Sequence, residues 1–149
     1  MGLKKSVDEV RVEIPGDLKY EKVVREVTEV VATRMGFSDT EVKNMKVAVD
    51  EASSNAIRHA KPKDPKDNRV VITYSIEPSK LVISIKDNGQ GFDPKAVRPS
   101  IDSLIESEGG RGIFLMKNLT DKVEYDTSPG KGTTVRLIKY LNQDRKKSR

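Results

Sequence analysis

Apolar and polar residues alternate along several stretches of the chain, as they do in strands with one buried face. In residues 10–14, Val10, Val12 and Ile14 alternate with charged neighbours. The same alternation covers residues 70–76 and 81–85, which a turn with proline at its second position separates. A last pair of strands is predicted between residues 123 and 141. The pattern therefore predicts a mostly antiparallel sheet.

Two longer stretches repeat their apolar residues every three or four positions, as amphipathic helices do. Residues 18–35 predict the first helix, and Gly36 is a natural end for it. Its buried stripe is expected to consist of Val24, Val27, Val31 and Met35, widened by Val23 and Val30. Residues 39–60 predict the second helix, because Ser38 and Glu41 before it have the spacing of a capping box.

Polar residues follow one edge of the apolar stripe of the second helix. The core-facing positions are Met45, Ala48, Val49, Ala52 and Ala56. Glu51 and Asn55 lie roughly 40° apart around the helix at the border of this stripe, and His59 continues the edge one turn later. A carboxylate, a carboxamide and an imidazole thus line up where a site wall is expected. Half-exposed polar residues without chemistry would give the same pattern.

Two glycine motifs flank a long segment with weak periodicity. Asp87-x-Gly89-x-Gly91 follows a strand that would hold the carboxylate, while its glycines would let a ligand approach the backbone. Gly110-x-Gly112 is expected just before a short helix, whose unpaired amides favour phosphate. The segment between the motifs is expected to be a lid or disordered. Each motif alone also fits an ordinary turn or a loop-to-helix joint.

The order of predicted elements is strand, two helices, hairpin, loop, helix and hairpin. This order favours an α+β fold, a two-layer sandwich with helices on one face of the sheet. The length of 149 residues suits a single domain over residues 1–149. The basic tail, residues 142–149, is interpreted as a flexible, solubilising end.

The net charge of +5 raises the question of nucleic-acid binding. Four of the last five residues are basic, so the rest of the chain is close to neutral, and only 5% of residues are aromatic. We therefore expect no direct nucleic-acid contact. No apolar run reaches membrane-spanning length, so no membrane contact is expected. The absence of cysteine excludes a thiolate metal site and fits a cytoplasmic location.

Taken in order, these motifs resemble those of the GHKL superfamily, the ATP-binding domains shared by gyrase and histidine kinases. Residues 49–56 (Val-Asp-Glu-Ala-Ser-Ser-Asn-Ala) look like the N box, and residues 87–92 (Asp-Asn-Gly-Gln-Gly-Phe) like the first glycine box. Residues 110–112 and 132–133 look like the second and the last. The resemblance covers essentially the whole chain and implies the Bergerat ATP-binding fold.

Within that superfamily the chain is similar to the bacterial anti-sigma factor serine kinases. Gyrase-like enzymes need a transducer domain, and histidine kinases need a phosphoacceptor histidine on an upstream hairpin. The only histidine here is His59, inside the predicted helix. The resemblance implies a protein serine/threonine kinase that binds a sigma factor and phosphorylates a serine of an anti-sigma factor antagonist. It also implies a homodimer.

The resemblance further implies a role for each motif residue, with ATP and Mg²⁺ as cofactors. Asp87 would accept a hydrogen bond from the adenine amine, with Thr133 nearby. Asn55 would coordinate Mg²⁺, and Glu51 would take the proton of the attacking serine hydroxyl. The other cofactor-binding positions would be Gly89, Gly91, Gly110 and Gly112, and Arg111 is a candidate phosphate or partner contact. His59 has no assigned role and is expected to be packed and hydrogen-bonded.

Two other classes of function remain open from the sequence. The first is a module that binds ATP only to shape a sigma-binding or regulatory surface, without phosphotransfer. Glu51 favours the kinase, because a simple binder would not need a carboxylate there. The second is a nucleic-acid-binding protein, which only the basic tail supports.

Overall fold

The computed structural model describes residues 7–59, 64–88, 110–127 and 132–141. Five strands form one sheet in the order β1-β2-β3-β5-β4, and every described pairing is antiparallel. The strands are β1 (Asp8–Pro15), β2 (Arg69–Ile76), β3 (Lys80–Asp87), β4 (Lys122–Thr127) and β5 (Thr133–Tyr140). The helices are α1 (Glu21–Met35), α2 (Asp39–His59) and α4 (Gly110–Leu119), with short 3-10 turns η1 (Leu18–Tyr20) and η2 (Pro65–Asp67).

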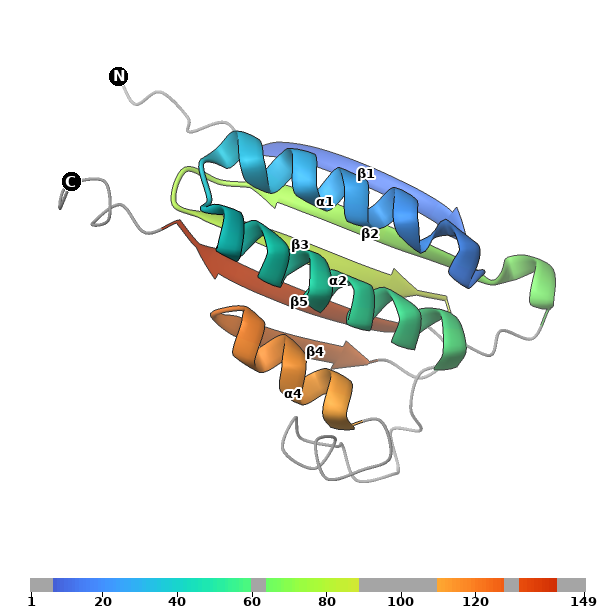
Figure 1. The fold of residues 1–149 in the computed structure, drawn as a ribbon. Coiled ribbons are helices and arrows are strands. Elements are labelled where there is room, and N and C mark those ends of the chain that lie inside the picture. The colour runs from blue at the N-terminus through green and yellow to red at the C-terminus, as the bar shows by residue number, and fades with distance from the viewer. Residues whose placement is uncertain (1–6, 60–63, 89–109, 128–131, 142–149) are drawn as a thin grey trace, which may run out of the picture.

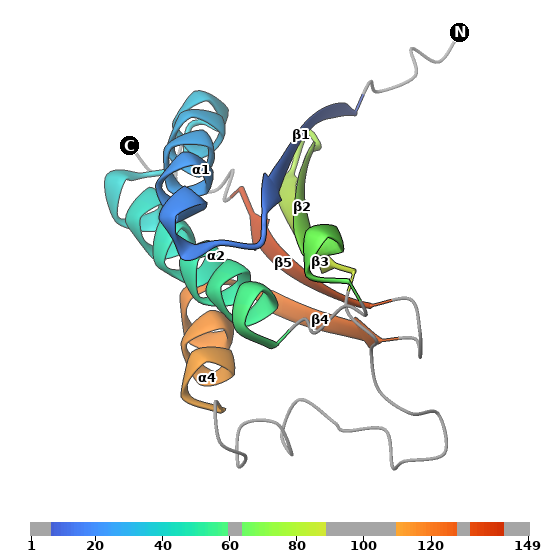
Figure 2. The ribbon, with the colours of Figure 1, turned by 90° about the vertical axis from the view of Figure 1, so that its right-hand side faces the viewer.

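The three α-helices lie on one face of the sheet (Figures 1 and 2). The predicted α+β two-layer sandwich is therefore confirmed. Tyr74, Ile83 and Leu137 stand side by side on β2, β3 and β5 and are at most 1% exposed. The predicted core-facing residues of α2 are all buried against this layer. The core thus lies between the sheet and the helices, and α2 runs across its centre.

Local signals set the ends of the two long helices as predicted. The Ser38 amide donates to Glu41 Oε1 at 3.0 Å and the Glu41 amide donates to Ser38 Oγ at 3.2 Å, which completes the capping box of α2. Gly36 ends α1 in the left-handed conformation, with φ of 95°. The predicted start of α1 at residue 18 is wrong by one turn, because Asp17 caps the 3-10 turn η1 instead.

Val23 and Val30 do not widen the buried stripe of α1 as predicted. They are 47% and 56% exposed, whereas Thr28 and Ala32 are fully buried. Each of the two valines precedes a buried valine by one position, which rotates it by about 100° away from the core. The buried Thr28 side chain satisfies its own polar atom by donating to the Val24 carbonyl at 2.8 Å.

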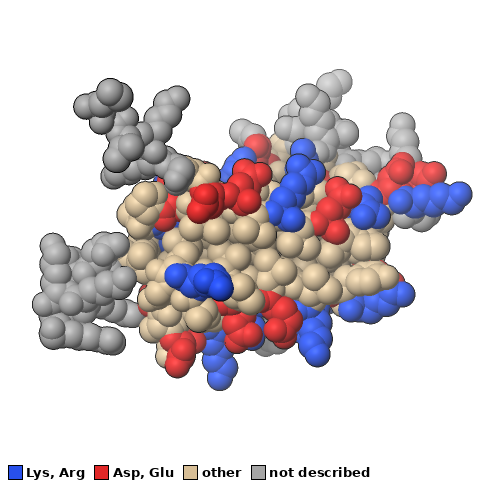
Figure 3. All heavy atoms as spheres, turned by 90° about the horizontal axis from the view of Figure 1, so that it is seen from above, with Lys and Arg blue, Asp and Glu red and all other residues tan. Residues whose placement is uncertain are grey.

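Charged residues of both signs are mixed over the face shown in Figure 3, on either side of an uncharged band. The described part of this face thus carries no extended basic patch of the kind that binds nucleic acid. Among the described helices, none combines the length and the apolar composition needed to cross a membrane.

Candidate functional site

The predicted site elements meet at one end of the molecule. The last turns of α2, the end of β3 and the start of β5 lie toward the right-hand end in Figure 1, and the first turn of α4 lies below α2. The two sequence segments that carry Asp87 and Thr133 are 46 residues apart and come together because β3 and β5 are neighbours in the sheet. The fold therefore assembles the candidate residues into two adjacent groups.

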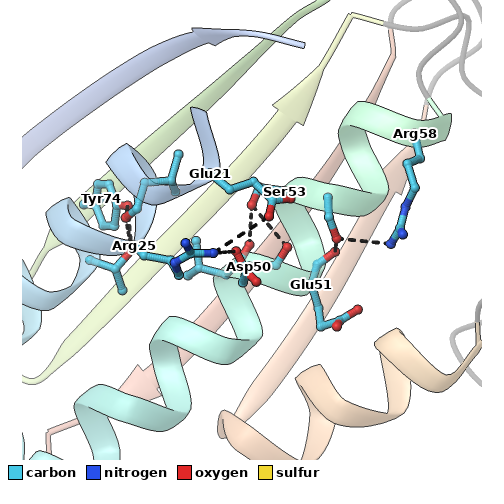
Figure 4. Close-up of polar contacts among 11 residues, drawn as sticks. Glu21, Arg25, Asp50, Glu51, Ser53, Arg58 and Tyr74 are labelled. Atoms are coloured by element: carbon cyan, nitrogen blue, oxygen red, sulfur yellow. Dashed lines mark hydrogen bonds and ion pairs between the residues drawn. The ribbon is translucent and has the colours of Figure 1, made fainter. Parts of the chain in front are cut away.

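The first group lies where α2 packs against α4. A β-carbon added at Gly112 would lie 2.8 Å from Glu51 Oε2 and 3.2 Å from Asn55 Nδ2. Both distances are too short for an ordinary contact, so the absence of a side chain at Gly112 is what lets the two polar residues of α2 approach α4. Glu51 points toward α4 (Figure 4). The structure thus brings Glu51, Asn55 and the second glycine motif together.

The second glycine motif lies inside α4 and not before it, so that prediction is wrong. The helix begins at Gly110, and Gly112 occupies its first turn. The sequence placed the start later because glycine is a poor helix former and the apolar repeat begins only at Ile113. The first amides of a helix have no partner within it, so the motif keeps the donors that a phosphate group needs.

Arg58 lies beside the candidate site, and the sequence analysis did not single it out. Its Nη2 donates to Ser54 Oγ at 3.2 Å and to Asn55 Oδ1 at 3.4 Å, at the exposed end of α2 (Figure 4). Its position three residues after Asn55 is a helical spacing that would have revealed it. It supplies a cation beside the amide oxygen that was predicted to bind Mg²⁺.

The second group surrounds Asp87 at the end of β3. Asp87 is only 9% exposed, and its Oδ1 accepts a hydrogen bond from the Thr133 amide at 3.2 Å. Gly132 has φ of 81° and passes so close to the Asp87 carbonyl that a β-carbon would collide with it. Burial, together with the charge of Asp87, raises the pKa of Tyr125, and a hydrogen bond with Thr133 partly offsets this. Asp87 and Thr133 therefore lie in direct contact, and their predicted roles toward adenine stay a prediction.

The remaining predicted residues do not all fall on described parts of the chain. Gly89, Gly91 and residues 92–109, the expected lid, lie outside the described residues. Arg111 is in the first turn of α4, and its side chain is outside them as well. His59 is exposed at the end of α2, so the prediction of a packed histidine is wrong.

A further polar cluster, also missed from the sequence, joins α1 to α2 one residue before Glu51. Arg25 Nη1 lies 2.9 Å from Asp50 Oδ1 and 3.9 Å from Glu21 Oε2 (Figure 4). Burial and the nearby Asp50 carboxylate raise the pKa of Glu21 to about 7, although Arg25 acts in the opposite direction. The other Glu21 carboxylate oxygen, Oε1, is buried without a hydrogen-bond partner.

Residues 14–139 match the family described as the histidine kinase-like ATPase domain. The chain belongs to this family. It is 34% identical to the serine-protein kinase RsbW of Bacillus pumilus and 33% identical to that of Bacillus subtilis. Each alignment covers 96% of this chain and 92% of the relative. This kinship makes the chain a protein serine/threonine kinase of the GHKL type, as the motifs indicated.

Solved structures share the fold at low sequence identity. The RsbU and RsbW domains of a Mycobacterium tuberculosis protein superpose with a TM-score of 0.66 at 15% identity, over 89% of this chain and 32% of that longer one. The histidine kinase domain of a blue-light activated kinase from Erythrobacter litoralis superposes with a TM-score of 0.56 at 19% identity, over 97% of this chain and 68% of that one. Both neighbours support the predicted Bergerat-type sandwich.

Proposed function

We propose that the chain uses ATP to phosphorylate a serine of an anti-sigma factor antagonist and that it binds a sigma factor when the antagonist does not displace it. The observation that carries the catalytic half is the placement of Glu51 and Asn55 against Gly112, on the first turn of α4. The regulatory half is supported by the kinship with the kinases named RsbW.

The two residue groups divide the nucleotide between them. The carboxylate of Asp87 accepts a hydrogen bond from the adenine amine, and Thr133 fixes the orientation of that carboxylate. The amides at Gly110 and Gly112 bind phosphate oxygens at the start of α4. The serine hydroxyl oxygen bonds to the γ-phosphorus as ADP leaves, and Glu51 takes the hydroxyl proton. The phosphate thus passes to the antagonist, and the proton passes to Glu51.

The donor set around Asn55 suits Mg²⁺. The described residues contain no group of three His, Cys, Asp or Glu side chains that could hold a metal by themselves. Mg²⁺ keeps several waters and binds through few protein oxygens together with substrate phosphates, so a single amide oxygen fits it. Asn55 Oδ1 accepts from Arg58 in this structure, so Mg²⁺ would replace the Arg58 guanidinium on that oxygen. Mg²⁺ would neutralise phosphate charge there.

The wider proposal includes a homodimer in the cytoplasm that makes no direct contact with nucleic acid or membrane. On the face that Figure 3 shows, charges of both signs are mixed, which does not favour nucleic acid there. A second candidate function is an ATP-binding regulatory module without transfer. The kinase is favoured because Glu51 is directed at the glycine motif that is expected to bind phosphates.

Labelled ATP separates the two candidates. We expect γ-phosphate label to move to a serine of one small antagonist protein when candidate partners from the same genome are tested in turn. Binding of ATP and of a sigma factor, with no label on any partner, would favour the regulatory module.

Asp87→Asn tests the adenine assignment. An amide in place of the carboxylate can present a donor to the adenine amine, and a buried unpaired group costs about 1–3 kcal/mol. We expect ATP affinity to fall roughly tenfold to a hundredfold in calorimetric titration, and selectivity over GTP to fall with it. Asp8→Asn, at the opposite end of the sheet, is the matched control and should bind like the parent. Unchanged affinity in Asp87→Asn would refute the assignment.

A further inference from the structure

The backbone pairing that holds β3 in the sheet stops at the residue proposed to bind adenine. The last pair with β5 is Lys86 and Thr134. The last pair with β2 is Asp87 and Val70. Asp87 therefore lies at a strand end, and a strand end frays unless other contacts hold it.

The side chain of Asn88 continues the contact with β2 beyond the last backbone pair. Its Oδ1 accepts a hydrogen bond from the Arg69 amide at 3.2 Å, and its Nδ2 donates to the Asp67 carbonyl. Arg69 is the first residue of β2, and Asp67 is the last residue of the turn η2. A carboxamide offers the same donor and acceptor as a peptide group. The Asn88 side chain thus holds the chain just after Asp87 to η2 and β2.

The start of β5 holds the same two residues from the other side. The Thr133 amide donates to Asp87 Oδ1 at 3.2 Å. A β-carbon added at Gly132 would lie only 3.2 Å from Asn88 Cα and would collide with the Asp87 carbonyl. Asp87 and Asn88 are therefore packed against β5 on one side and hydrogen-bonded to η2 and β2 on the other. Loss of the Asn88 carboxamide would release the second side.

We propose that Asn88 is a positioning residue for adenine recognition. Its carboxamide fixes the backbone next to Asp87, so the Asp87 carboxylate keeps the direction in which it accepts from the adenine amine. Direction matters because a hydrogen bond weakens steeply when it is bent. The role requires no contact between Asn88 and the nucleotide. The inference rests on the adenine assignment of Asp87 in the proposed function and adds the residue that orients it.

The chain offers a matched control in Asn68, which lies between the two partners of Asn88. Asn68 Nδ2 donates to the Gly16 carbonyl at 3.2 Å, and the Gly16 amide donates to the Asn68 carbonyl at 2.6 Å. Both asparagine side chains thus hold the same short segment through main-chain groups. Only Asn88 is a neighbour of Asp87 in the chain. Asn68→Ala therefore tests what a general loosening of this segment does to nucleotide binding.

Calorimetric titration with adenosine and with ATP tests the positioning role without depending on phosphotransfer. We expect Asn88→Ala to weaken the binding of both ligands by the same factor, roughly threefold to tenfold, because the loss is at the adenine end. Asn68→Ala should have a lower melting temperature than the parent and bind both ligands like the parent. Asn88→Asp is the second variant in case the alanine variant does not fold. It keeps the acceptor for the Arg69 amide and replaces the donor to the Asp67 carbonyl by an oxygen, so it should weaken adenosine binding as well.

Hydrogen exchange at the Thr133 amide provides a second readout, without nucleotide. This amide donates to the Asp87 carboxylate, so its exchange rate reports whether the carboxylate stays in place. Exchange should be at least threefold faster in the Asn88 variants than in the parent and unchanged in Asn68→Ala. Thermal melting of every variant shows whether it is folded.

Parent-like adenosine affinity in both Asn88 variants would overturn the positioning role, and so would parent-like exchange at Thr133. An equal loss of adenosine affinity in Asn68→Ala and Asn88→Ala would overturn it too, because the effect would then come from loosening of the segment. These outcomes leave the proposed function standing. Parent-like ATP binding by Asp87→Asn would instead overturn the adenine assignment itself, and the positioning role with it.

Discussion

At the scale of single residues, Gly112 and Gly132 each occupy a position where a side chain would collide with another element. Gly112 lets α4 approach Glu51, and Gly132 passes the Asp87 carbonyl with φ of 81°. The sequence could identify both motifs, because glycine spacing is visible in it. It could not show that the glycines make room for Glu51 and Asp87, since that follows from tertiary contacts.

Arg58 makes a prediction at the same scale. We propose that it binds a phosphate of ATP, because it is the cation placed on Asn55 Oδ1. A hydrogen bond to a charged group contributes about 1.5–3 kcal/mol, less where it is exposed as here. Arg58→Gln should therefore weaken ATP binding by roughly threefold to tenfold and leave adenosine binding unchanged in titration. Lys43→Gln, also exposed on α2, is the control, and equal loss for ATP and adenosine would contradict the phosphate contact.

At the scale of elements, the sequence predicted what is local and failed where packing decides. Capping-box spacing located the start of α2, because Ser38 and Glu41 satisfy each other's backbone amides. The start of α4 was predicted too late, because glycine is a poor helix former. In the structure the helix includes Gly110 and Gly112, and Gly112 packs closely against Glu51 and Asn55 of α2. Val23 and Val30 were wrongly predicted to be buried, because the apolar stripe of α1 is wider than the part of the helix that packs on the core.

The cluster between α1 and α2 makes the stability of the protein depend on pH. The pKa of Glu21 is raised from 4.5 to about 7 in the folded state, so folding disfavours its charged form. The free energy of unfolding should therefore fall as the pH rises from about 4.5 to about 7. Glu21→Gln removes this dependence and should be at least as stable as the parent above pH 7.

Denaturant unfolding at a series of pH values between 4.5 and 8 measures this dependence. Glu26→Gln, one turn further along the exposed side of α1, is the matched control and should follow the parent. If the parent and Glu21→Gln had the same free energy of unfolding at every pH, the Glu21 carboxyl group would not titrate with folding.

At the scale of the whole molecule, strand order brings the nucleotide residues together. The order β1-β2-β3-β5-β4 places β5 beside β3, so that Thr133 reaches Asp87 across 46 residues of sequence. Hairpins could be predicted from alternation, but the pairing of β3 with β5 could not, because no short turn connects them.

The central claim is that this assembly transfers phosphate with Glu51 as the proton acceptor. Single-turnover transfer from ATP to the antagonist, at saturating ATP, tests it most directly in Glu51→Gln. The amide keeps the size of the side chain but cannot accept the proton, so transfer should slow by about 10²–10⁴-fold while ATP and sigma factor binding persist. Asn55→Ala should instead lose Mg²⁺-ATP affinity together with transfer. Transfer by Glu51→Gln at the parent rate would contradict the account.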